Sequence, residues 1–461
     1  MSDDLRHALS TLHPSPVDVD PVAYGQDWTR VATPAPLAVV QPQTVQEVQS
    51  IVRWARTHRV ALVPSGGRTG LSGGAVAARG ELVVSMDRMR AITEFRAADQ
   101  SLTVEAGVTT QEVQEAARHH GLFYPVDFAS RGSSQIGGNV ATNAGGIRVL
   151  RYGLTRERVL GLKIVTGTGE LLDLNRGLVK NATGYDLRHL VIGSEGTLGI
   201  VVEATLRLVE APPPQQVMML ALSGLEAIMP VFASLRRRLT LSAFEFLTDK
   251  ALRHVVAAGA RRPFALEAPV LVLAEFDANE DAAVAAFVDA QQAGYVVDAV
   301  VSQSDAQAAE LWRVREGITE SLARFTPYKN DIAVRVGDVP AFLVSADALF
   351  AREYPDWEVV WFGHIGDGNL HISILPPLGH PPSEFRHSCE RVTELLGNLL
   401  AVFGGSISAE HGVGLWKKPV LHCSRPAMEI ALMRGVKSLF DPDGLMNPGK
   451  IFDPATATSM S

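Results

Sequence analysis

Two histidines, His364 and His371, stand seven residues apart in the segment FGHIGDGNLHISI. On one straight strand an odd separation places two side chains on opposite faces. The intervening GDGN is a turn signal, and a turn lets both rings converge from neighbouring strand ends. The pair is therefore a candidate metal site, although two histidines beside a turn are also consistent with loop residues that only form hydrogen bonds.

A second cluster, SAEHGVG, places Glu410 directly before His411 in a loop flanked by glycine. Two histidines and one glutamate form a three-ligand set, which is typical of a metal site that keeps an open position. With His364, His371 and Glu410 as ligands, His411 is left for proton transfer. Zinc fits these ligand types, and Mn²⁺, Co²⁺ or Fe²⁺ would fit them too.

Three glycine-rich segments lie in the first half of the chain: Pro64–Gly74, Ser133–Gly146 and Gly193–Ile200. The first follows an apolar run, and such a loop can turn successive backbone N–H groups towards an anion. Taken alone, this segment is also consistent with a surface loop. Three such segments together favour a large, extended cofactor that is contacted at several points. The Walker A and Rossmann patterns are missing, which argues against a P-loop NTPase or an NAD enzyme.

Candidate substrate-binding residues lie in WRVREGITESLARFTPYKND. Arg315 and Thr319 are spaced i, i+4, so they share one face of a predicted helix, and Lys329 follows in a turn marked by proline. The fork of an arginine suits a carboxylate. A solvated surface charge is the other interpretation of each of these residues.

The surrounding pattern predicts an α+β protein. Apolar spacing after Thr44 predicts a helix, with Thr44 as N-cap and Glu47 as its capping-box partner. The proline-rich APPP at 211–214 marks a domain boundary. Strands and helices of antiparallel type follow it. We therefore expect domains at 1–213, 214–404 and 405–461, the last a C-terminal helical segment.

Composition limits the remaining possibilities. A chain of 461 residues predicts two or three domains, and its net charge of -8 argues against nucleic-acid binding. The only cysteines, Cys389 and Cys423, form no CxxC pair, which excludes zinc-ribbon and iron–sulfur motifs. The N-terminus lacks a secretory pattern and no run of 18 apolar residues occurs, so we expect a cytoplasmic protein without a membrane span.

The three glycine-rich segments, together with KNATGYDLRHL at 180–190, resemble the FAD-binding domain of the vanillyl-alcohol oxidase/PCMH flavoprotein superfamily. Within it, residues 25–452 resemble the FAD-linked D-2-hydroxyacid dehydrogenases, above all those acting on D-2-hydroxyglutarate. The most specific marker is FYPVDFASRGSSQIGGNVATNAGGIRVLRYG. This resemblance implies a PCMH-type FAD-binding domain and an antiparallel-sheet substrate domain. It also implies FAD that is bound non-covalently, since no His or Cys stands where relatives attach it.

The resemblance also implies which residues contact FAD. They are Pro64, Gly66, Gly67, Arg68, Thr69, Gly70, Ser72, Pro125, Ser133, Gly137, Gly138, Asn139, Thr142, Asn143, Gly196 and Ile200, with Asn447 of MNPGK reaching back to the flavin or its surroundings.

For the second site, the resemblance supports the metal ligands named above and assigns Arg315, Thr319 and Lys329 to carboxylate recognition. It implies that the metal orients the substrate's carboxylate and hydroxyl, that His411 accepts the hydroxyl proton, and that FAD takes the hydride. Ser373 is a departure, because the D-2-hydroxyglutarate enzymes usually have Asn at this substrate-contacting position. It leaves the preferred substrate chain length open.

Other functions are weaker interpretations. D-lactate or glycolate dehydrogenase keeps the enzyme class and changes the substrate. A zinc hydrolase leaves the glycine-rich segments unexplained, and the intact His/His/Glu/His set argues against a non-catalytic flavin-binding subunit. As partners we expect a small 2-hydroxy acid, an electron-transfer flavoprotein as acceptor and a second copy of the chain in a homodimer, the last two by resemblance alone.

Overall fold

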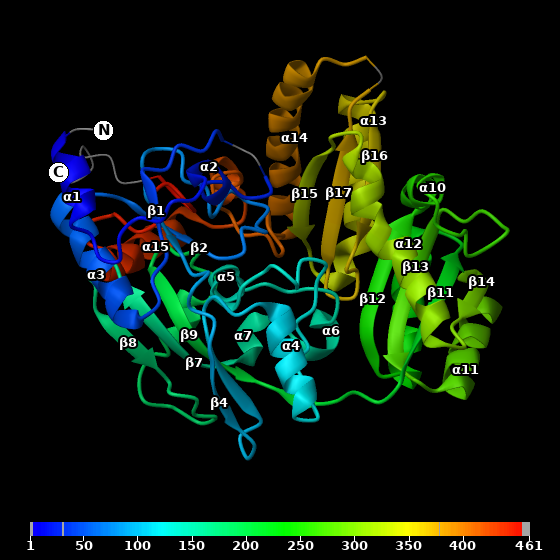
Figure 1. The fold of residues 1–461 in the computed structure, drawn as a ribbon. Helices are drawn as coiled ribbons and strands as arrows, with labels where there is room; N and C mark the ends of the chain where they lie inside the picture. Colours follow the sequence, from blue (N-terminus) through cyan, green and yellow to red (C-terminus); the bar gives the residue numbers. More distant parts are fainter. Residues whose placement is uncertain (1–2, 30–31, 378, 454–461) are drawn as a thin grey trace. The chain divides into compact units, whose positions relative to one another are not determined.

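The computed structural model describes residues 3–29, 32–377 and 379–453, which form two compact units (Figure 1). Unit 1 comprises the chain up to Gly146, Gly153–Ala211 and the chain from Glu410 onwards. Unit 2 comprises Ile147–Tyr152 and Pro212–Ala409. The chain therefore enters unit 2 briefly, returns to unit 1, and crosses again near the proline-rich 211–214. The three domains expected from the sequence stay a prediction.

The described residues of unit 1 form three sheets. A parallel sheet has the order β1-β3-β2, with β1 at Ala38–Val40, β2 at Leu62–Ser65 and β3 at Leu82–Ser85. An antiparallel sheet has the order β4-β5-β9-β7-β8, and a short pair joins β10 to β6. The bounds of these strands are Ile92–Arg96 (β4), Ser101–Glu105 (β5), Leu122–Phe123 (β6), Val159–Thr166 (β7), Leu171–Leu174 (β8), Gly199–Arg207 (β9) and Val209–Glu210 (β10).

Two of the longer helices of unit 1 begin at side-chain caps. In α3 (Val45–His58) the hydroxyl of Thr44 accepts from the Glu47 N–H at 3.2 Å, as predicted. The Glu47 carboxylate accepts from the N–H of Gln43, one residue before the cap, so the expected capping box is only half formed. A complete box starts α4 (Thr110–His119) at Thr109. The other helices are α1 (Asp3–Ser10), α2 (Pro21–Tyr24), α5 (Ile136–Thr142), α7 (Thr155–Arg158), α8 (Arg188–Val191), the 3₁₀ helix η3 (Lys418–Cys423) and α15 (Ala427–Phe440).

The C-terminal segment packs into unit 1. Met446 bridges to Leu62 of β2, and Met446 lies in the same buried apolar cluster as Leu62. The ammonium of Lys437 donates to the carbonyl oxygens of Thr197 and Met446 at 2.6 and 2.8 Å. Residues far apart in sequence therefore support the same glycine-rich region.

Unit 2 is built on an antiparallel sheet of order β14-β11-β13-β12-β16-β17-β15 (Figure 1). Its strands are Gln215–Leu222 (β11), Leu241–Thr248 (β12), Val270–Asp277 (β13), Val296–Val301 (β14), Tyr328–Ala333 (β15), Glu358–Gly363 (β16) and Asn369–Leu375 (β17). The α+β class predicted from the sequence is confirmed.

Helices cover both faces of this sheet. Leu311, Val314 and Ile318 of α12 (Asp305–Ala323) share a core cluster with Leu247 of β12 and Phe362 of β16. The opposite face carries Phe244, which stacks on Phe232 of α9 (Ile228–Arg238), and Trp361, which meets Phe342 of α13 (Val339–Glu353) edge to face. The other helices are α6 (Val149–Tyr152), η1 (Leu225–Ala227), α10 (Asp249–Ala257), α11 (Glu280–Gln292), η2 (Val336–Asp338) and α14 (Pro382–Phe403).

Two ion pairs bind the segment Ile147–Tyr152 to the rest of unit 2. Arg148 pairs with Glu275 of β13 at 3.0 Å, and Glu275 is 4% exposed. Glu275 also accepts from Ser242 and from the indole of Trp312. Arg151 pairs with Asp277 on the same strand. Six residues inserted from the first half of the sequence are thus part of the second unit.

No helix in the described part of the chain has the length and apolar character needed to cross a bilayer.

Candidate functional site

The three glycine-rich segments line one cleft in unit 1, with an empty volume of about 920 Å³. The first segment leaves β2, the second forms the start of α5, and the third turns into β9. Thirteen of the predicted FAD residues line this cleft. They are Pro64, Gly66, Gly67, Arg68, Thr69, Gly70, Ser72, Gly137, Gly138, Asn139, Thr142, Gly196 and Ile200.

Four predicted FAD residues lie elsewhere in unit 1. Pro125, Ser133, Asn143 and Asn447 are absent from the cleft wall. Asn143 ends α5 with a left-handed backbone (φ 52°), and its side-chain oxygen accepts from the N–H of Arg156 at 2.9 Å. Ser133 supports the wall from behind, because a Cβ on Gly67 would lie 1.9 Å from its carbonyl oxygen. Only glycine lets these two backbones pack so closely.

Asn447 supports the cleft through backbone contacts. Its amide donates to the carbonyl oxygens of Gly74 at 2.9 Å and Glu195 at 2.7 Å, and both of those residues line the cleft. Asn447 is 2% exposed. The C-terminal segment therefore ties two of the glycine-rich segments together.

Two features of the cleft suit a bound ligand. A Cβ on Gly138 would meet nothing within 4 Å, so the wall is open to a ligand at that point. The Oε1 atom of Gln135 is buried in the cleft wall and has no hydrogen-bond partner among the described residues, while its amide donates to Asp87 at 2.7 Å. A buried polar atom without a partner is costly unless a ligand or water satisfies it. Gln135 was missed in the sequence, although it stands inside the second segment.

Arg68 does not present an isolated charge. Its guanidinium donates to the carbonyl of Gly66 at 2.9 Å, lies 3.6 Å from the Asp87 carboxylate and covers the ring of Tyr24 at 4.3 Å. Asp87 therefore offsets part of its charge. The contacts hold the guanidinium at the edge of the cleft.

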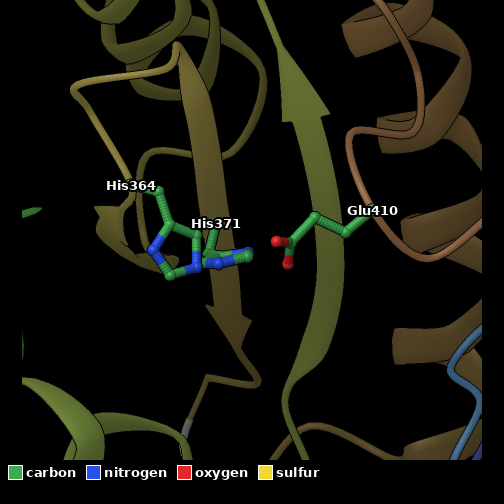
Figure 2. Close-up of side chains that lie close together, drawn as sticks. All are labelled: His364, His371 and Glu410. Atoms are coloured by element: carbon green, nitrogen blue, oxygen red, sulfur yellow. The ribbon is translucent and has the colours of Figure 1, made fainter. Parts of the chain in front are cut away.

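The two histidines of the second site come from one hairpin of unit 2. His364 follows β16 and His371 lies in β17, and their ring centroids are 5.1 Å apart with the rings nearly perpendicular (Figure 2). The turn between them needs Gly368, which has φ 84° and whose Cβ would lie 2.1 Å from the carbonyl oxygen of Val334. The turn brings both rings together, as the sequence predicted.

Each imidazole is held by a buried carboxylate. The Nδ1 atom of His364 lies 2.8 Å from Glu245 Oε1, and the Nδ1 atom of His371 lies 3.4 Å from Asp331 Oδ1. Both carboxylate side chains are 1% exposed. A neutral imidazole whose Nδ1–H points to a carboxylate carries its lone pair on Nε2, which is the arrangement of metal-binding histidines. The donor set therefore fits a divalent metal ion.

Sheet register explains this arrangement. Asp331 of β15 pairs with His371 of β17, and His371 pairs with Phe362 of β16. Because side chains alternate along a strand, Lys329 and Ser373 lie on the same face as these residues, and they face each other in the register. Candidate metal ligands and candidate substrate residues thus share one face of the sheet.

Glu245 also binds Arg315. The two side chains pair at 2.8 Å, and Arg315 is 7% exposed on α12. Burial alone raises the pKa of Glu245, but the charges of His364 and Arg315 outweigh it and hold the pKa below its usual value. The Nε atom of Arg315 is buried without a hydrogen-bond partner among the described residues. One carboxylate thus joins a candidate metal ligand to a candidate substrate residue.

The remaining predicted residues lie near these elements. Thr319 is exposed one turn after Arg315. Desolvation by the surrounding protein lowers the pKa of the Lys329 ammonium. Ser373 is buried in β17. These positions leave their role in substrate binding a prediction.

Glu410 and His411 begin the C-terminal part of unit 1. Glu410, also labelled in Figure 2, follows Ala409 directly in the chain, and Ser406 bridges to Ala333 at the end of β15. Within unit 1, Glu410 Oε1 accepts from the N–H of Gly146 at 2.9 Å. Gly146 is the last residue of the second glycine-rich segment, so this segment contacts a candidate metal ligand.

Sequence reasoning missed Glu245 and Asp331. A signal was present for Glu245, because a carboxylate inside the apolar strand AFEFL needs a buried partner. The partner itself is 119 residues away in the sequence. Only the sheet register brings the two together.

Comparison with known proteins agrees with the fold and the cleft. Residues 36–175 match the family model described as "FAD binding domain", and residues 211–451 match "FAD linked oxidases, C-terminal domain". The chain belongs to this family of FAD-linked oxidoreductases. It is 59% identical to a D-2-hydroxyglutarate dehydrogenase of Xanthomonas citri pv. viticola, over 97% of this chain and 96% of the relative. It is 53% identical to a D-2-hydroxyglutarate dehydrogenase of Stutzerimonas stutzeri, over 93% and 94%.

A solved structure shares the fold. The p-cresol methylhydroxylase structure superimposes with a TM-score of 0.77 over 98% of each chain, at 14% sequence identity. The PCMH-type fold predicted from the sequence is thus confirmed. The match to the two family models supports the predicted FAD cofactor.

Proposed function

We propose that this protein oxidises a D-2-hydroxy acid to the 2-oxo acid, with D-2-hydroxyglutarate as preferred substrate. The observation that carries the proposal is the similarity over nearly the whole chain to two relatives named for this substrate. Bound FAD supplies the two-electron oxidant. Non-covalent binding is supported by the cleft wall, since none of the described residues that line it is His, Cys or Tyr.

We further propose that His364, His371 and Glu410 hold a divalent ion, zinc on ligand type. Support comes from the carboxylates of Glu245 and Asp331, which orient the two rings as in known metal sites. A metal bound there supplies Lewis acidity towards the substrate's carboxylate and hydroxyl.

The protein's own groups would bind and deprotonate the substrate. His411 would accept the proton of the 2-hydroxyl, since a neutral imidazole is a competent base near pH 7. Lys329, with Arg315 and Thr319, would bind the distal carboxylate, and Ser373 would adjoin it. Support comes from the shared sheet face of Lys329, Ser373 and His371. An electron-transfer flavoprotein as acceptor, a homodimer and a cytoplasmic location belong to the same proposal.

Anaerobic reduction of the bound flavin tests the function. D-2-hydroxyglutarate should bleach the visible flavin absorption faster than D-lactate or glycolate, and L-2-hydroxyglutarate should leave it unchanged. Faster bleaching by D-lactate or glycolate would reassign the substrate. If no 2-hydroxy acid bleached the flavin, the proposed reaction would be wrong.

Two further arms test the site. Chelator treatment should abolish bleaching while FAD stays bound, and added Zn²⁺ should restore it; a rate unaffected by the chelator would refute the metal. His411→Ala should keep FAD and lose reduction by substrate. His422→Ala, an exposed histidine of the same C-terminal segment, is the matched control. Equal rates in both variants would remove His411 as the base.

A further inference from the structure

Glu195 is a buried carboxylate in the wall of the FAD cleft. It stands in GSEGTLGI, in the turn before β9, and is 7% exposed. Its backbone is left-handed (φ 54°), which is uncommon for a residue with a side chain. Such a conformation persists where surrounding contacts enforce it, often at functional sites.

Those contacts lead to the loop after His411. Glu195 Oε1 accepts from the N–H of Val413 at 2.7 Å, and Oε2 accepts from the N–H of Gly414 at 2.7 Å. The carboxylate thus binds two successive peptide groups, beginning two residues after His411. Val413 is 218 positions away in the sequence, so this is a contact of the tertiary fold.

Two more contacts join the same loop to the cleft. The N–H groups of Leu415 and Trp416 donate to the carbonyl oxygen of Ser72, at 3.0 and 3.1 Å, and Ser72 lines the cleft. The carbonyl oxygen of Glu195 accepts from Asn447. The first and third glycine-rich segments therefore both hold residues 413–416.

Both side-chain oxygens of Glu195 accept a backbone N–H, as an ionised carboxylate does. Burial raises the pKa of Glu195 above its usual value, and the two N–H donors and the charges of Lys417 and Lys450 offset only part of this rise. Hydrogen bonds to an ionised acceptor are about twice as strong as neutral ones. Replacing the carboxylate by an amide leaves one of the two backbone N–H groups facing an NH₂ group. One of the two hydrogen bonds to the loop is then lost.

We propose that Glu195 is a positioning residue of the reaction, which holds the loop carrying Glu410 and His411 in register with the FAD cleft. This inference rests on the proposed roles of Glu410 and His411. A small displacement of a base or a metal ligand lowers the reaction rate by orders of magnitude. The two hydrogen bonds from Val413 and Gly414 to Glu195, here called the clamp, should therefore affect turnover and not cofactor binding alone.

Glu195→Gln tests the proposal, with Asp441→Asn as the matched control. Asp441 lies in the same unit, is 2% exposed, and likewise accepts from two successive N–H groups, those of Leu445 and Met446 at 3.1 and 2.8 Å. Asp441 is absent from the cleft wall. Its carboxylate also pairs with the ammonium of Lys437, which donates to the carbonyl oxygen of Thr197, so this control also removes a buried charge beside the third glycine-rich segment. Both variants lose one side of a buried clamp, but only Glu195→Gln should disturb the loop after His411.

For each holoprotein we would measure the unfolding temperature, the FAD content and the retention of Zn²⁺ against a chelator. We would also measure the rate of anaerobic flavin reduction by saturating D-2-hydroxyglutarate, and the pH dependence of that rate. We expect Glu195→Gln to lower the reduction rate per bound FAD by about 10- to 100-fold, with a shifted pH profile and weaker Zn²⁺ retention. Asp441→Asn should lower the unfolding temperature and leave rate and pH profile near wild type.

Equal reduction rates per bound FAD in the two variants would overturn the clamp. If Glu195→Gln yields no holoprotein, Glu195→Asp replaces it in the same comparison. This variant keeps the negative charge but moves the carboxylate away from the loop 413–416. If no 2-hydroxy acid bleached the flavin of the wild-type protein, the proposed function would be wrong. This result differs from equal rates in the two variants, which would refute only the role of Glu195.

Discussion

Glu245→Gln is the sharpest test of the second site. The carboxylate is 1% exposed and contacts Arg315 and His364 at 2.8 Å each. Glutamine keeps the shape and removes the charge, so the buried guanidinium of Arg315 loses its counter-ion. Breaking a buried pair from one side costs about 3–5 kcal/mol of unfolding free energy.

The same change releases His364. Loss of the group that orients a ligating histidine typically weakens metal affinity by about 10- to 100-fold. We therefore expect Glu245→Gln to lower the unfolding free energy in denaturant titrations and to lose Zn²⁺ to a chelator at correspondingly lower concentrations. FAD binding should persist, because the cleft belongs to unit 1.

An exposed pair in the same unit provides the control. Arg238 and Asp289 form an ion pair with side chains 43% and 45% exposed, so Asp289→Asn should cost at most about 1 kcal/mol. The double variant Glu245→Gln/Arg315→Met should recover part of the stability, since it leaves no unpaired buried charge. If Glu245→Gln matched Asp289→Asn in both stability and Zn²⁺ retention, the reasoning would be refuted.

Three further outcomes follow from unit 1. Gly138→Val should weaken FAD binding at least about tenfold in titrations of the apoprotein, because its side chain enters the cleft; unchanged affinity would place the cofactor elsewhere. Asn447→Ala removes two hydrogen bonds, and should cost about 2 kcal/mol in unfolding free energy and speed FAD release; a neutral result would deny it a supporting role. Burial lowers the pKa of Lys450 from 10.5 to about 8, so the unfolded chain binds more protons between these values and stability rises with pH. The stability difference between wild type and Lys450→Met should grow by about 3 kcal/mol from pH 8 to pH 10.5, and a flat difference would contradict the shift.

Local patterns in the sequence were sufficient for much of the architecture and for the cleft. Glycine at Gly67 and Gly137 signals close packing, and the glycine-rich segments that contain them do share one wall. The turn between His364 and His371 could be predicted because glycine and asparagine reveal a hairpin over a short range. These features depend on neighbours in the sequence.

Features that depend on tertiary pairing were not predictable in this way. Asp331 meets His371 only through the register of β15 and β17, and Glu195 meets Val413 only in the folded unit. Arg315 was interpreted as a substrate cation, and nothing in its helix spacing indicates that Glu245 already pairs with it. Buried carboxylates inside apolar runs were the one signal that pointed to such partners.

Because Ile147–Tyr152 belongs to unit 2, the protein cannot be divided simply at one point in the sequence. A fragment made of residues 212–409 alone would contain the whole seven-stranded sheet but would lack Arg148, the partner of buried Glu275, and α6, which packs on β12. Unit 2 is therefore completed by the peptide Ile147–Tyr152, which precedes its main body, Pro212–Ala409, in the sequence. Dissection of this enzyme, its circular permutation or the grafting of unit 2 onto another flavoprotein would have to include that peptide.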